Sequence, residues 1–420
     1  MSISDLNKKG PSRTLAWTMW ALTALSYAFQ YIFRLLPNVI KDDILVKFSV
    51  NADDFGTFSG MYYLGYALAH IPVGVLIDRA SPRVVISCGM LLCSVGVLPL
   101  VYLDGWIWSV IGRFVLGVGS STAILGVFYV IRISFPSNRF ASILGMAVTV
   151  GLLGALFGTR PVSILIDAFG WKNVIQGMFL IGVVLAVVLF VLIPCGDRSS
   201  APKNSVLLDL QEVLTNKRVW LVALCAALMV GPLEGFADAW GVPFFKTVYG
   251  FDKAQAEILP SLVFFGMCFG APMLAYIGEK MKRFYLLTVI CATVMCVVFL
   301  VMLFSSVALE ALYVLMVLVG VLSGYQVFIM FLNSKNAEVR LSGVVTSVTN
   351  MTIMSFGFLF HKIIGHTVNS FWGGLTENGV PVYSAEAYTS GLVVIPVALF
   401  VAALGFIYLR PKDEYKLLED

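Results

Sequence analysis

Charged residues are scarce in this sequence. Asp, Glu, Lys and Arg make up only 12% of its 420 residues, whereas 59% of the residues are hydrophobic. A soluble globular domain has about 25% charged residues, so half of the charge that a water-exposed surface needs is missing. The composition excludes a soluble globular protein and predicts a chain whose solvent is lipid.

Motifs of catalysis and metal binding are missing as well. The chain contains no HExxH, no GxSxG and no GxxxxGK[ST]. No two of its seven cysteines have the spacing of metal ligands. We therefore expect no enzyme, no cofactor and no metal. The first apolar run is too long for the core of a signal peptide and lacks a cleavage site, so we expect it to remain as a helix.

Long apolar runs dominate what is present. A helix needs about 20 apolar residues to cross the hydrocarbon of a bilayer, and twelve runs meet this requirement. They predict an all-α membrane protein with twelve transmembrane helices. The runs are 15–40, 54–77, 83–103, 106–131, 140–166, 173–194, 219–246, 255–277, 284–305, 309–332, 342–368 and 387–409.

Basic residues are distributed unequally between the loops. Of the 28 Lys and Arg residues, nineteen lie in the two termini and in every second loop between them, and five lie in the opposite loops. Basic loops stay in the cytoplasm, so both termini and the central loop should be cytoplasmic. Compact loops favour a bacterial inner membrane. The tail "DEYKLL" (413–418) fits an acidic dileucine sorting signal and leaves a lysosomal or endosomal membrane as the alternative.

The two halves of the chain repeat each other at an offset of about 200 residues. "GVLIDRASPR" (74–83) corresponds to "AYIGEKMKR" (275–283), "LGVGSS" (116–121) to "VGVLSG" (319–324), and "RFASILG" at 139 to "RLSGVVT" at 340. Three matches in order predict six plus six helices around a pseudo-two-fold axis. The predicted domains are an N-terminal six-helix half at 1–194, a linker at 195–218 and a C-terminal six-helix half at 219–420. Within the linker, 205–215 predicts a short amphipathic helix on the membrane surface.

These motifs resemble those of the major facilitator superfamily over essentially the whole chain. "GVLIDRASPR" is similar to the signature between the second and third helices, and "GRFVLGVGSS" to the fourth-helix motif. The resemblance implies a twelve-helix transporter of the nutrient and organic-anion porter type. The matching residues are Gly74, Asp78, Arg79, Arg83, Arg113, Gly117 and Gly119.

Some positions depart from the family pattern. Ser81 stands where the signature has glycine. Lys172 stands where the family has the arginine of the Gly-Trp-Arg motif that begins the sixth helix. The Gly-Pro pair that is common in the fifth helix of antiporters is absent, because Thr159 follows Gly158. This difference argues against an antiporter.

Charges inside the apolar runs are candidates for substrate binding. A charge at depth costs about 2.5–3.5 kcal/mol even on the lenient insertion scale, so it usually faces a cavity. Arg34 lies about twenty residues into the first run, and its guanidinium fork suits a carboxylate or phosphate. Gln30 lies one turn earlier on the same face. Arg160 is beside Pro161, where a broken helix exposes backbone to a cavity.

An acidic pair marks the seventh run. Glu234 and Asp238 in "GPLEGFADAW" are four residues apart, so a regular helix would place them on one face. Gly231–Pro232 should loosen the helix just before them. Two acids in a low-dielectric pocket cannot both ionise cheaply, which makes them candidates for proton coupling and for binding a substrate ammonium group.

Three further polar residues complete the candidate site. His70 in the second run is a candidate proton relay, or a buried neutral histidine that makes a hydrogen bond. Gln326 and Asn350 occupy corresponding regions of the tenth and eleventh runs. Their side chains either contact the solute or join helices.

Charges at helix ends are candidates for gating. Asp78–Arg79 and Glu279–Lys280 follow the second and eighth runs at equivalent positions of the repeat, and Arg83 completes the first motif. An acid at a helix end can pair with a base of the neighbouring helix and latch one state. The alternative is that these charges only set topology. For Arg113, coupling and packing remain equally open.

The sequence thus predicts a secondary active transporter that works by alternating access. Arg34 and the two acids favour proton-coupled uptake of an amino acid or small peptide. The alternatives are a porter for an organic anion or phosphate ester, an uncoupled facilitator, and a transporter-like membrane sensor without transport. The expected partners are a small-molecule solute, protons and the lipid bilayer. We expect a monomer and no nucleic-acid partner.

Overall fold

The computed structural model describes residues 12–136, 139–194, 206–377 and 380–411. Within these ranges the regular secondary structure is helical, apart from a two-residue antiparallel pair formed by β1 (Thr376–Glu377) and β2 (Val380–Pro381). The sorting pattern at 413–418 and residues 195–205 of the linker lie outside the described residues.

The described residues divide by their packing into two compact units, each described separately below. The first unit contains residues up to 36 and from 65 to 194, and the second contains residues 37–64 and those from 206 onward. The segment 37–64 therefore packs with helices that follow the linker, although its neighbours in the sequence pack in the first unit. The division at 194 and 218 that the sequence suggests stays a prediction.

The first unit contains the larger part of α2 and the second half of α4. Its other helices are α5 to α10. Their bounds are α2 Arg13–Val39, α4 Ala52–Arg79, α5 Pro82–Val95, α6 Leu98–Tyr102, α7 Trp106–Ser134, α8 Phe140–Phe157, α9 Arg160–Phe169 and α10 Trp171–Leu192.

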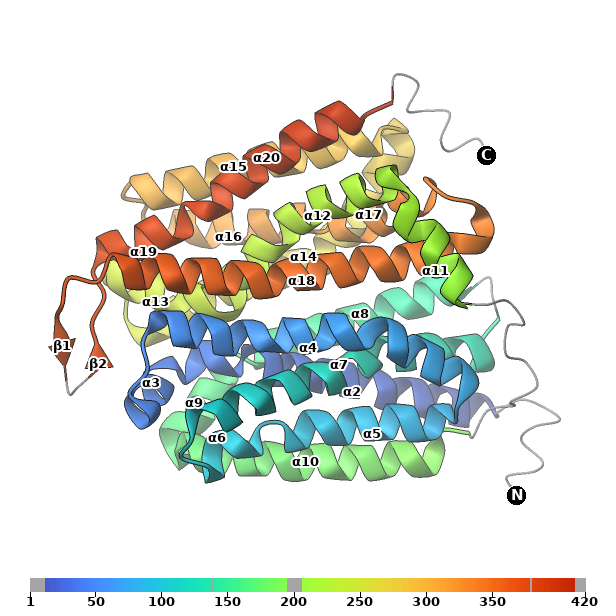
Figure 1. Cartoon of the computed structure of the whole chain (residues 1–420), viewed down its shortest axis with the longest axis horizontal. Coiled ribbons are helices and arrows are strands. Elements are labelled where there is room, and N and C mark those ends of the chain that lie inside the picture. Colours follow the sequence, from blue (N-terminus) through green and yellow to red (C-terminus); the bar gives the residue numbers. More distant parts are fainter. Residues whose placement is uncertain (1–11, 137–138, 195–205, 378–379, 412–420) are drawn as a thin grey trace. The chain divides into compact units, whose positions relative to one another are not determined.

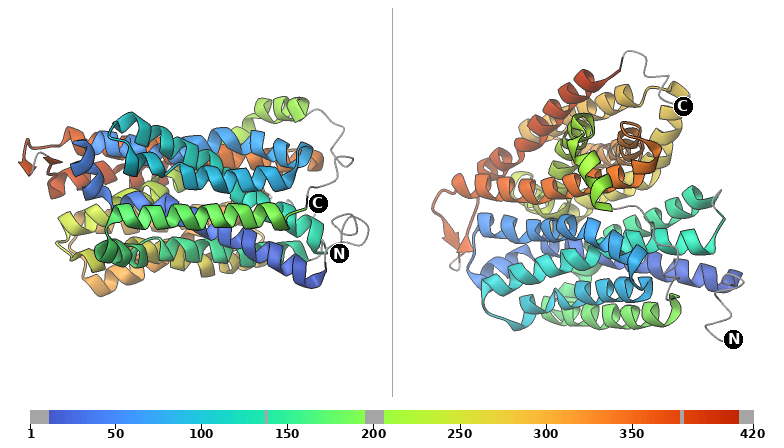
Figure 2. Two further views of the ribbon diagram at one scale, coloured as in Figure 1. Left: turned by 90° about the horizontal axis from the view of Figure 1, so that it is seen from below. Right: turned by 45° about the vertical axis from the view of Figure 1, so that its right-hand side comes forward.

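The second unit contains α3, the first half of α4 and all elements from α11 onward. Their bounds are α3 Lys41–Phe48, α11 Val206–Thr215, α12 Lys217–Gly235, η3 Phe236–Trp240, α13 Gly241–Val248, α14 Lys253–Met281, α15 Phe284–Phe304, α16 Leu309–Ser323, α17 Tyr325–Ser334, η4 Val339–Leu341, α18 Ser342–Ser370, α19 Ala385–Leu392 and α20 Val394–Leu409. In this unit, α3 and the β1–β2 pair lie at one end of α18 and α11 lies at the other end (Figure 1, Figure 2).

Every predicted apolar run coincides with a helix or with consecutive helices, so the predicted fold class is confirmed. Among the described residues, ten helices are long and apolar enough to cross a membrane, or eleven if the bent pair α8–α9 is one span. The first predicted span, α2, is not among them, although it has 27 residues. Polar side chains such as Gln30 and Arg34 lower its hydropathy.

Glycines allow equivalent helices to approach closely in each unit. Gly65 on α4 meets the backbone of α7 at Phe114, and Gly266 on α14 meets the backbone of α16 at Val317. A side chain at either glycine would collide with a carbonyl oxygen, and small residues commonly mediate such contacts in membranes. Gly65 and Gly266 are 201 residues apart, the same offset as Arg139 and Arg340 in the sequence repeat. The repeat therefore extends to helix packing.

Candidate transport site and gate residues

A π-helical turn interrupts the seventh span at Asp238, the second residue of the acidic pair. We call η3, Phe236–Trp240, the π-turn; the N–H of Gly241 donates to the carbonyl of Phe236, five residues back. Pro243 cannot donate to the carbonyl of Ala239, and its ring crowds that carbonyl, so the preceding turn widens. Such π-helical turns are rare in proteins, and those that do occur often lie at functional sites.

The irregular backbone lies further along the chain than the sequence indicated. We expected the helix to loosen at Gly231–Pro232, before Glu234, but α12 continues through both residues to Gly235. The expected position was wrong by about one turn, because Pro232 is accommodated within α12 while the widened turn surrounds Asp238.

Asp238 lies on the π-turn and is buried. The hydroxyl of Tyr63 on α4 donates a hydrogen bond to its Oδ2 atom. The Tyr63 ring in turn lies 5.0 Å from the ring of His361 on α18, and Nδ1 of His361 is 2.8 Å from the carbonyl oxygen of Gly357. The acid is thus held among α4, the π-turn and α18, all within the second unit.

Glu234 has a different environment. Its side chain is half-buried, and it interacts electrostatically with the buried Tyr325 at the start of α17. The two acids therefore have different neighbours, since the π-turn changes the helical phase after Glu234. Gln326 and Asn350, the other two candidates in this unit, are half-buried on α17 and α18.

Further buried polar groups surround the π-turn. The amide Nδ2 of Asn38 donates to the carbonyl of Ala237 at 3.0 Å. Among the described side chains, Oδ1 of Asn38 and the indole N–H of Trp240 make no hydrogen bond, although both atoms are buried. Buried polar atoms usually have partners, so these two atoms are available to a bound solute or a water molecule.

Lys41, at the start of α3, is buried next to the π-turn. Its Nζ atom lies 5.0 Å from the ring centroid of Trp240, 5.6 Å from that of Phe55 and 4.9 Å from that of Tyr388. It donates to the Tyr388 hydroxyl at 2.6 Å. Burial lowers the pKa of Lys41 to about 8, although the neighbouring Asp42 opposes this shift.

Arg34, in the first unit, is buried and stacks over the ring of Tyr31 at 5.2 Å. Gln30 is buried on the same helix and lines a small cavity together with Thr23, Ser26 and Thr122. The cavity volume of about 10 Å³ is close to the minimum for one water molecule. Both residues are therefore buried, as expected for polar residues at depth.

Arg113 on α7 holds the backbone of α2 beside Arg34. Its two terminal nitrogens donate to the carbonyl oxygens of Phe33 at 2.7 Å and Arg34 at 2.5 Å. Pro37 lies inside α2 and has no N–H, so the carbonyl of Phe33 lacks its usual helical donor. The guanidinium replaces that donor. This geometry favours the packing interpretation of Arg113 that the sequence left open.

Two other candidates of the first unit lie at helix irregularities. Arg160 is half-buried at the start of α9, where the helix axis bends by 41° from α8. The expected broken helix at Arg160–Pro161 is therefore present. His70 is buried on α4 and stacks on Tyr66, with ring centroids 5.3 Å apart. Pro72 follows two residues later inside the same helix.

The predicted gate residues lie at helix ends. Asp78 and Arg79 end α4, but their side chains lie outside the described part of the structure. Arg83 donates to the carbonyl of Ile193 at 2.7 Å and so joins the start of α5 to the end of α10. Glu279 and Lys280 are exposed in the last turn of α14.

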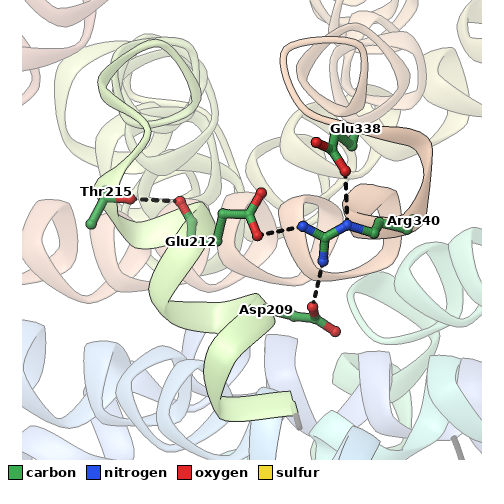
Figure 3. A network of polar contacts seen from close by, with 5 residues as sticks. All are labelled: Asp209, Glu212, Thr215, Glu338 and Arg340. Carbon is green, nitrogen blue, oxygen red and sulfur yellow. Dashed lines mark hydrogen bonds and ion pairs between the residues drawn. The ribbon is translucent and has the colours of Figure 1, made fainter. Parts of the chain in front are cut away.

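A charge network that the sequence did not indicate fastens the linker helix α11 (Figure 3). Arg340 on η4, directly before α18, contacts Asp209 at 2.8 Å and Glu212 at 2.5 Å on α11, and Glu338 at 2.8 Å. The carboxylates of Glu212 and Glu338 raise the pKa of Arg340. Beside this network lies an open cavity of about 490 Å³, lined by residues that include Glu212 and Lys335. The expected helix at 205–215 is confirmed as α11.

Sequence reasoning also missed Lys41 and Tyr63. Lys41 was counted only as a loop base, and Tyr63 is one of many aromatic residues in an apolar run. One sequence signal was available, since Lys41 directly follows the apolar run that ends at Ile40. No three His, Cys, Asp or Glu side chains among the described residues come together as ligands for a metal.

The helices, the buried charges and the interrupted seventh span define a polytopic α-helical membrane protein. A family model for the Major Facilitator Superfamily matches residues 19–361. The chain therefore belongs to the Major Facilitator Superfamily, as its motifs indicated.

Similar proteins agree with this assignment. The chain is 22% identical over 287 residues to the uncharacterized transporter YybO of Bacillus subtilis, covering 62% of this chain and 64% of the relative. It is 23% identical over 217 residues to the nitrite extrusion protein of the same organism, covering 51% and 54%. The chain thus spans between half and two thirds of these relatives.

A solved structure resembles the fold over nearly its whole length. The crystal structure of a bacterial homologue of the human lysosomal transporter Spinster, in an inward-facing and occupied conformation, superposes with a TM-score of 0.78. It is 18% identical and covers 95% of this chain and 97% of its own. At this identity the likeness concerns the fold alone.

Proposed function

We propose that this chain is a secondary active transporter that moves a small polar solute by alternating access, and that it carries an amino acid or short peptide together with a proton. The observation that supports proton coupling most strongly is the difference between the two acids of the seventh span. Asp238 is buried and bonded to Tyr63, whereas Glu234 is half-buried and close to Tyr325. Acids in different environments can hold protons with different affinities.

The charges support a solute with both signs. Arg34 is buried and carries a fork that suits a carboxylate. We assign Arg34, with Gln30 and Arg160, to the carboxylate of the solute. Glu234 then takes the proton or the ammonium group, and Asp238 supports it. We assign His70 to proton transfer, and Gln326 and Asn350 to contacts with the polar body of the solute.

A small organic anion or a phosphate ester is the second candidate. A relative is named a nitrite extrusion protein, and Arg34 suits an anion that lacks an ammonium group. In this case Glu234 serves proton coupling alone.

Uptake into proteoliposomes tests the proposal. Labelled dialanine should enter faster under an imposed inward proton gradient. Glu234→Gln should abolish this acceleration while counterflow exchange continues, because exchange needs no net proton movement. Glu310→Gln, an exposed acid in the first turn of α16, is the matched control.

Other outcomes separate the alternatives. Uptake that ignores the gradient and a protonophore would indicate an uncoupled facilitator. Uptake of labelled succinate without uptake of dialanine would favour the anion porter. A purified chain that moves neither solute, and no other member of an amino-acid and organic-acid panel, would favour a sensor.

We further propose that the chain is a monomer in a bacterial inner membrane with both termini cytoplasmic. Labelling should then place Lys203 and Lys253 on opposite sides. We assign Asp78, Arg79, Glu279 and Lys280 to the cytoplasmic gate, supported by their positions at the ends of α4 and α14. A double variant, Asp78→Asn with Glu279→Gln, should transport poorly at normal expression. A normal transport rate in the double variant would show that these charges only set the topology of the chain.

A further inference from the structure

Four residues of the segment 37–64 contact three residues of the π-turn. Asn38 bonds to the carbonyl of Ala237, and Tyr63 bonds to the carboxylate of Asp238. The ammonium group of Lys41 lies over the indole ring of Trp240. The segment is thus seated on the π-turn through two hydrogen bonds, one cation–π contact and an edge-to-face contact between the rings of Phe55 and Trp240, all inside the second unit.

Helix packing adds to this seating. A Cβ atom at Gly56 on α4 would lie 2.5 Å from the carbonyl oxygen of His361 and 3.2 Å from the Cα atom of Gly365, both on α18. Gly60, one turn later, faces the same helix at Phe358. The backbones of α4 and α18 therefore approach closely along a glycine face, where dispersion contacts favour the seated arrangement.

Burial of Lys41, in contrast, disfavours the seated arrangement. Its ammonium group has three donors, but one hydroxyl, that of Tyr388, accepts from it, and aromatic rings cover the rest. No carboxylate among the described residues lies within salt-bridge distance of Nζ. Aromatic faces attract a cation, yet they replace only part of its hydration, so burying this charge has a net cost.

The segment also occupies a mechanically distinct place in the chain. It packs in the second unit, while α2 before it and α4 after it continue into the first unit. Any movement of one unit relative to the other during alternating access must therefore be transmitted through α2 and α4 and strain the contacts between the segment and the π-turn. A contact of this kind has to hold in one state and release in another.

We propose that Lys41 is a gating residue that keeps the seating of segment 37–64 on the π-turn reversible, because burial of its ammonium group opposes the contacts made by Tyr63, Asn38 and the glycine face. The segment leaves the π-turn in each transport cycle. This inference rests on the proposed transport by alternating access, but it holds for any solute and any coupling ion.

A cysteine reporter measures the seating directly. Ser59 is buried on α4, one turn before Tyr63 and close to its face, and its hydroxyl makes no hydrogen bond among the described residues. Ser59→Cys is therefore a conservative reporter in the full chain. Its reaction with N-ethylmaleimide at pH 7, quantified on its own peptide by mass spectrometry, reports how often the segment is released.

Lys41→Met keeps the length of the side chain and removes the charge. We expect labelling of the Ser59→Cys reporter to slow by about ten-fold, the factor equivalent to one unit of pKa, and the unfolding temperature to rise. Transport should slow as well, because the seated state becomes too stable. Lys47→Met, on the same short helix and next to Phe48, is the control and should leave labelling unchanged.

A second pair of variants changes the seating in the other direction. Gly56→Ala pushes α4 away from α18 and should accelerate labelling, whereas Gly74→Ala on the same helix, where a Cβ meets nothing within 4 Å, should not. Faster labelling and a lower unfolding temperature in Lys41→Met would overturn the proposal, since Lys41 would then only fasten the segment. Unchanged labelling in both Lys41→Met and Gly56→Ala would also overturn it. Labelling needs no solute, so failure of the transport proposal is seen separately.

Discussion

The hydroxyl of Tyr63 on α4 donates a hydrogen bond to Oδ2 of Asp238 on the π-turn. The two residues are 175 positions apart in the sequence, and both side chains are buried. The bond therefore joins the buried acid of the seventh span to α4.

Tyr63→Phe should therefore destabilise the protein. The variant leaves the ring in place but removes the donor from a buried acid, which costs about 1–3 kcal/mol. Thermal unfolding in detergent should show a lower transition temperature. Tyr408→Phe, which alters an exposed tyrosine at the end of α20, should show no change. Equal behaviour of the two variants would mean that the Tyr63 hydroxyl is not needed.

Arg113→Lys should also be destabilising, although it keeps the charge. One ammonium group cannot reach the carbonyls of Phe33 and Arg34 with the geometry of a guanidinium fork. The loss of one charge-assisted bond to a buried carbonyl costs about 1.5–3 kcal/mol. Unfolding temperatures can be compared with those of Arg132→Lys, an exposed arginine near the end of α7. A stable Arg113→Lys protein would show that Pro37 leaves no carbonyl in need of a donor.

Lys41 should make stability depend on pH in the alkaline range. The folded protein holds this lysine at a pKa of about 8, below its ordinary value of 10.5. The unfolded chain therefore binds more protons between these values, and stability rises with pH across this window. Below pH 8 the group is charged in both states and contributes no slope. The charged or titratable groups that act on Lys41 are Asp42, Lys246 on α13 and Tyr388 on α19.

The measurement compares the wild type with Lys41→Met. The variant should be the more stable protein at pH 7, and the difference in unfolding free energy should narrow by ~2 kcal/mol between pH 8 and pH 10. Lys47→Met should keep a constant difference from the wild type. A gap between wild type and Lys41→Met that stays constant with pH would contradict the perturbed pKa.

Arg340→Ala should release α11 without unfolding the protein. The arginine side chain is half exposed, so its two ion pairs with Asp209 and Glu212 hold the linker helix rather than the core. Limited proteolysis within 206–215 should become faster, and high salt should have a similar effect on the wild type because it screens exposed charges. Arg139→Ala, the equivalent residue of the first half, is the control. Equal proteolysis of both variants would show that α11 is held by its apolar face.

Much of the architecture follows from the sequence, because it depends on local composition and period. A run of apolar residues long enough to cross a bilayer must satisfy its own backbone hydrogen bonds, so it forms a helix wherever it packs. The offset of 201 residues between Arg139 and Arg340 likewise reappears between Gly65 and Gly266. The bend at Arg160 and the helix α11 were also visible in local patterns.

The neighbours of the polar side chains depend on the tertiary structure. A spacing of four residues suggested one shared face for Glu234 and Asp238, but the π-turn shifts the phase between them, and each acid has different partners. In the sequence Lys41 looked like a loop base, because the aromatic rings that surround it belong to positions 55, 240 and 388, which are distant along the chain. Local sequence determines that a segment is helical and apolar. Only the packing of the helices determines which distant side chains surround a buried charge. The energetic cost of burying the charge depends on the surrounding dielectric and on hydrogen-bond partners that are far away in the chain.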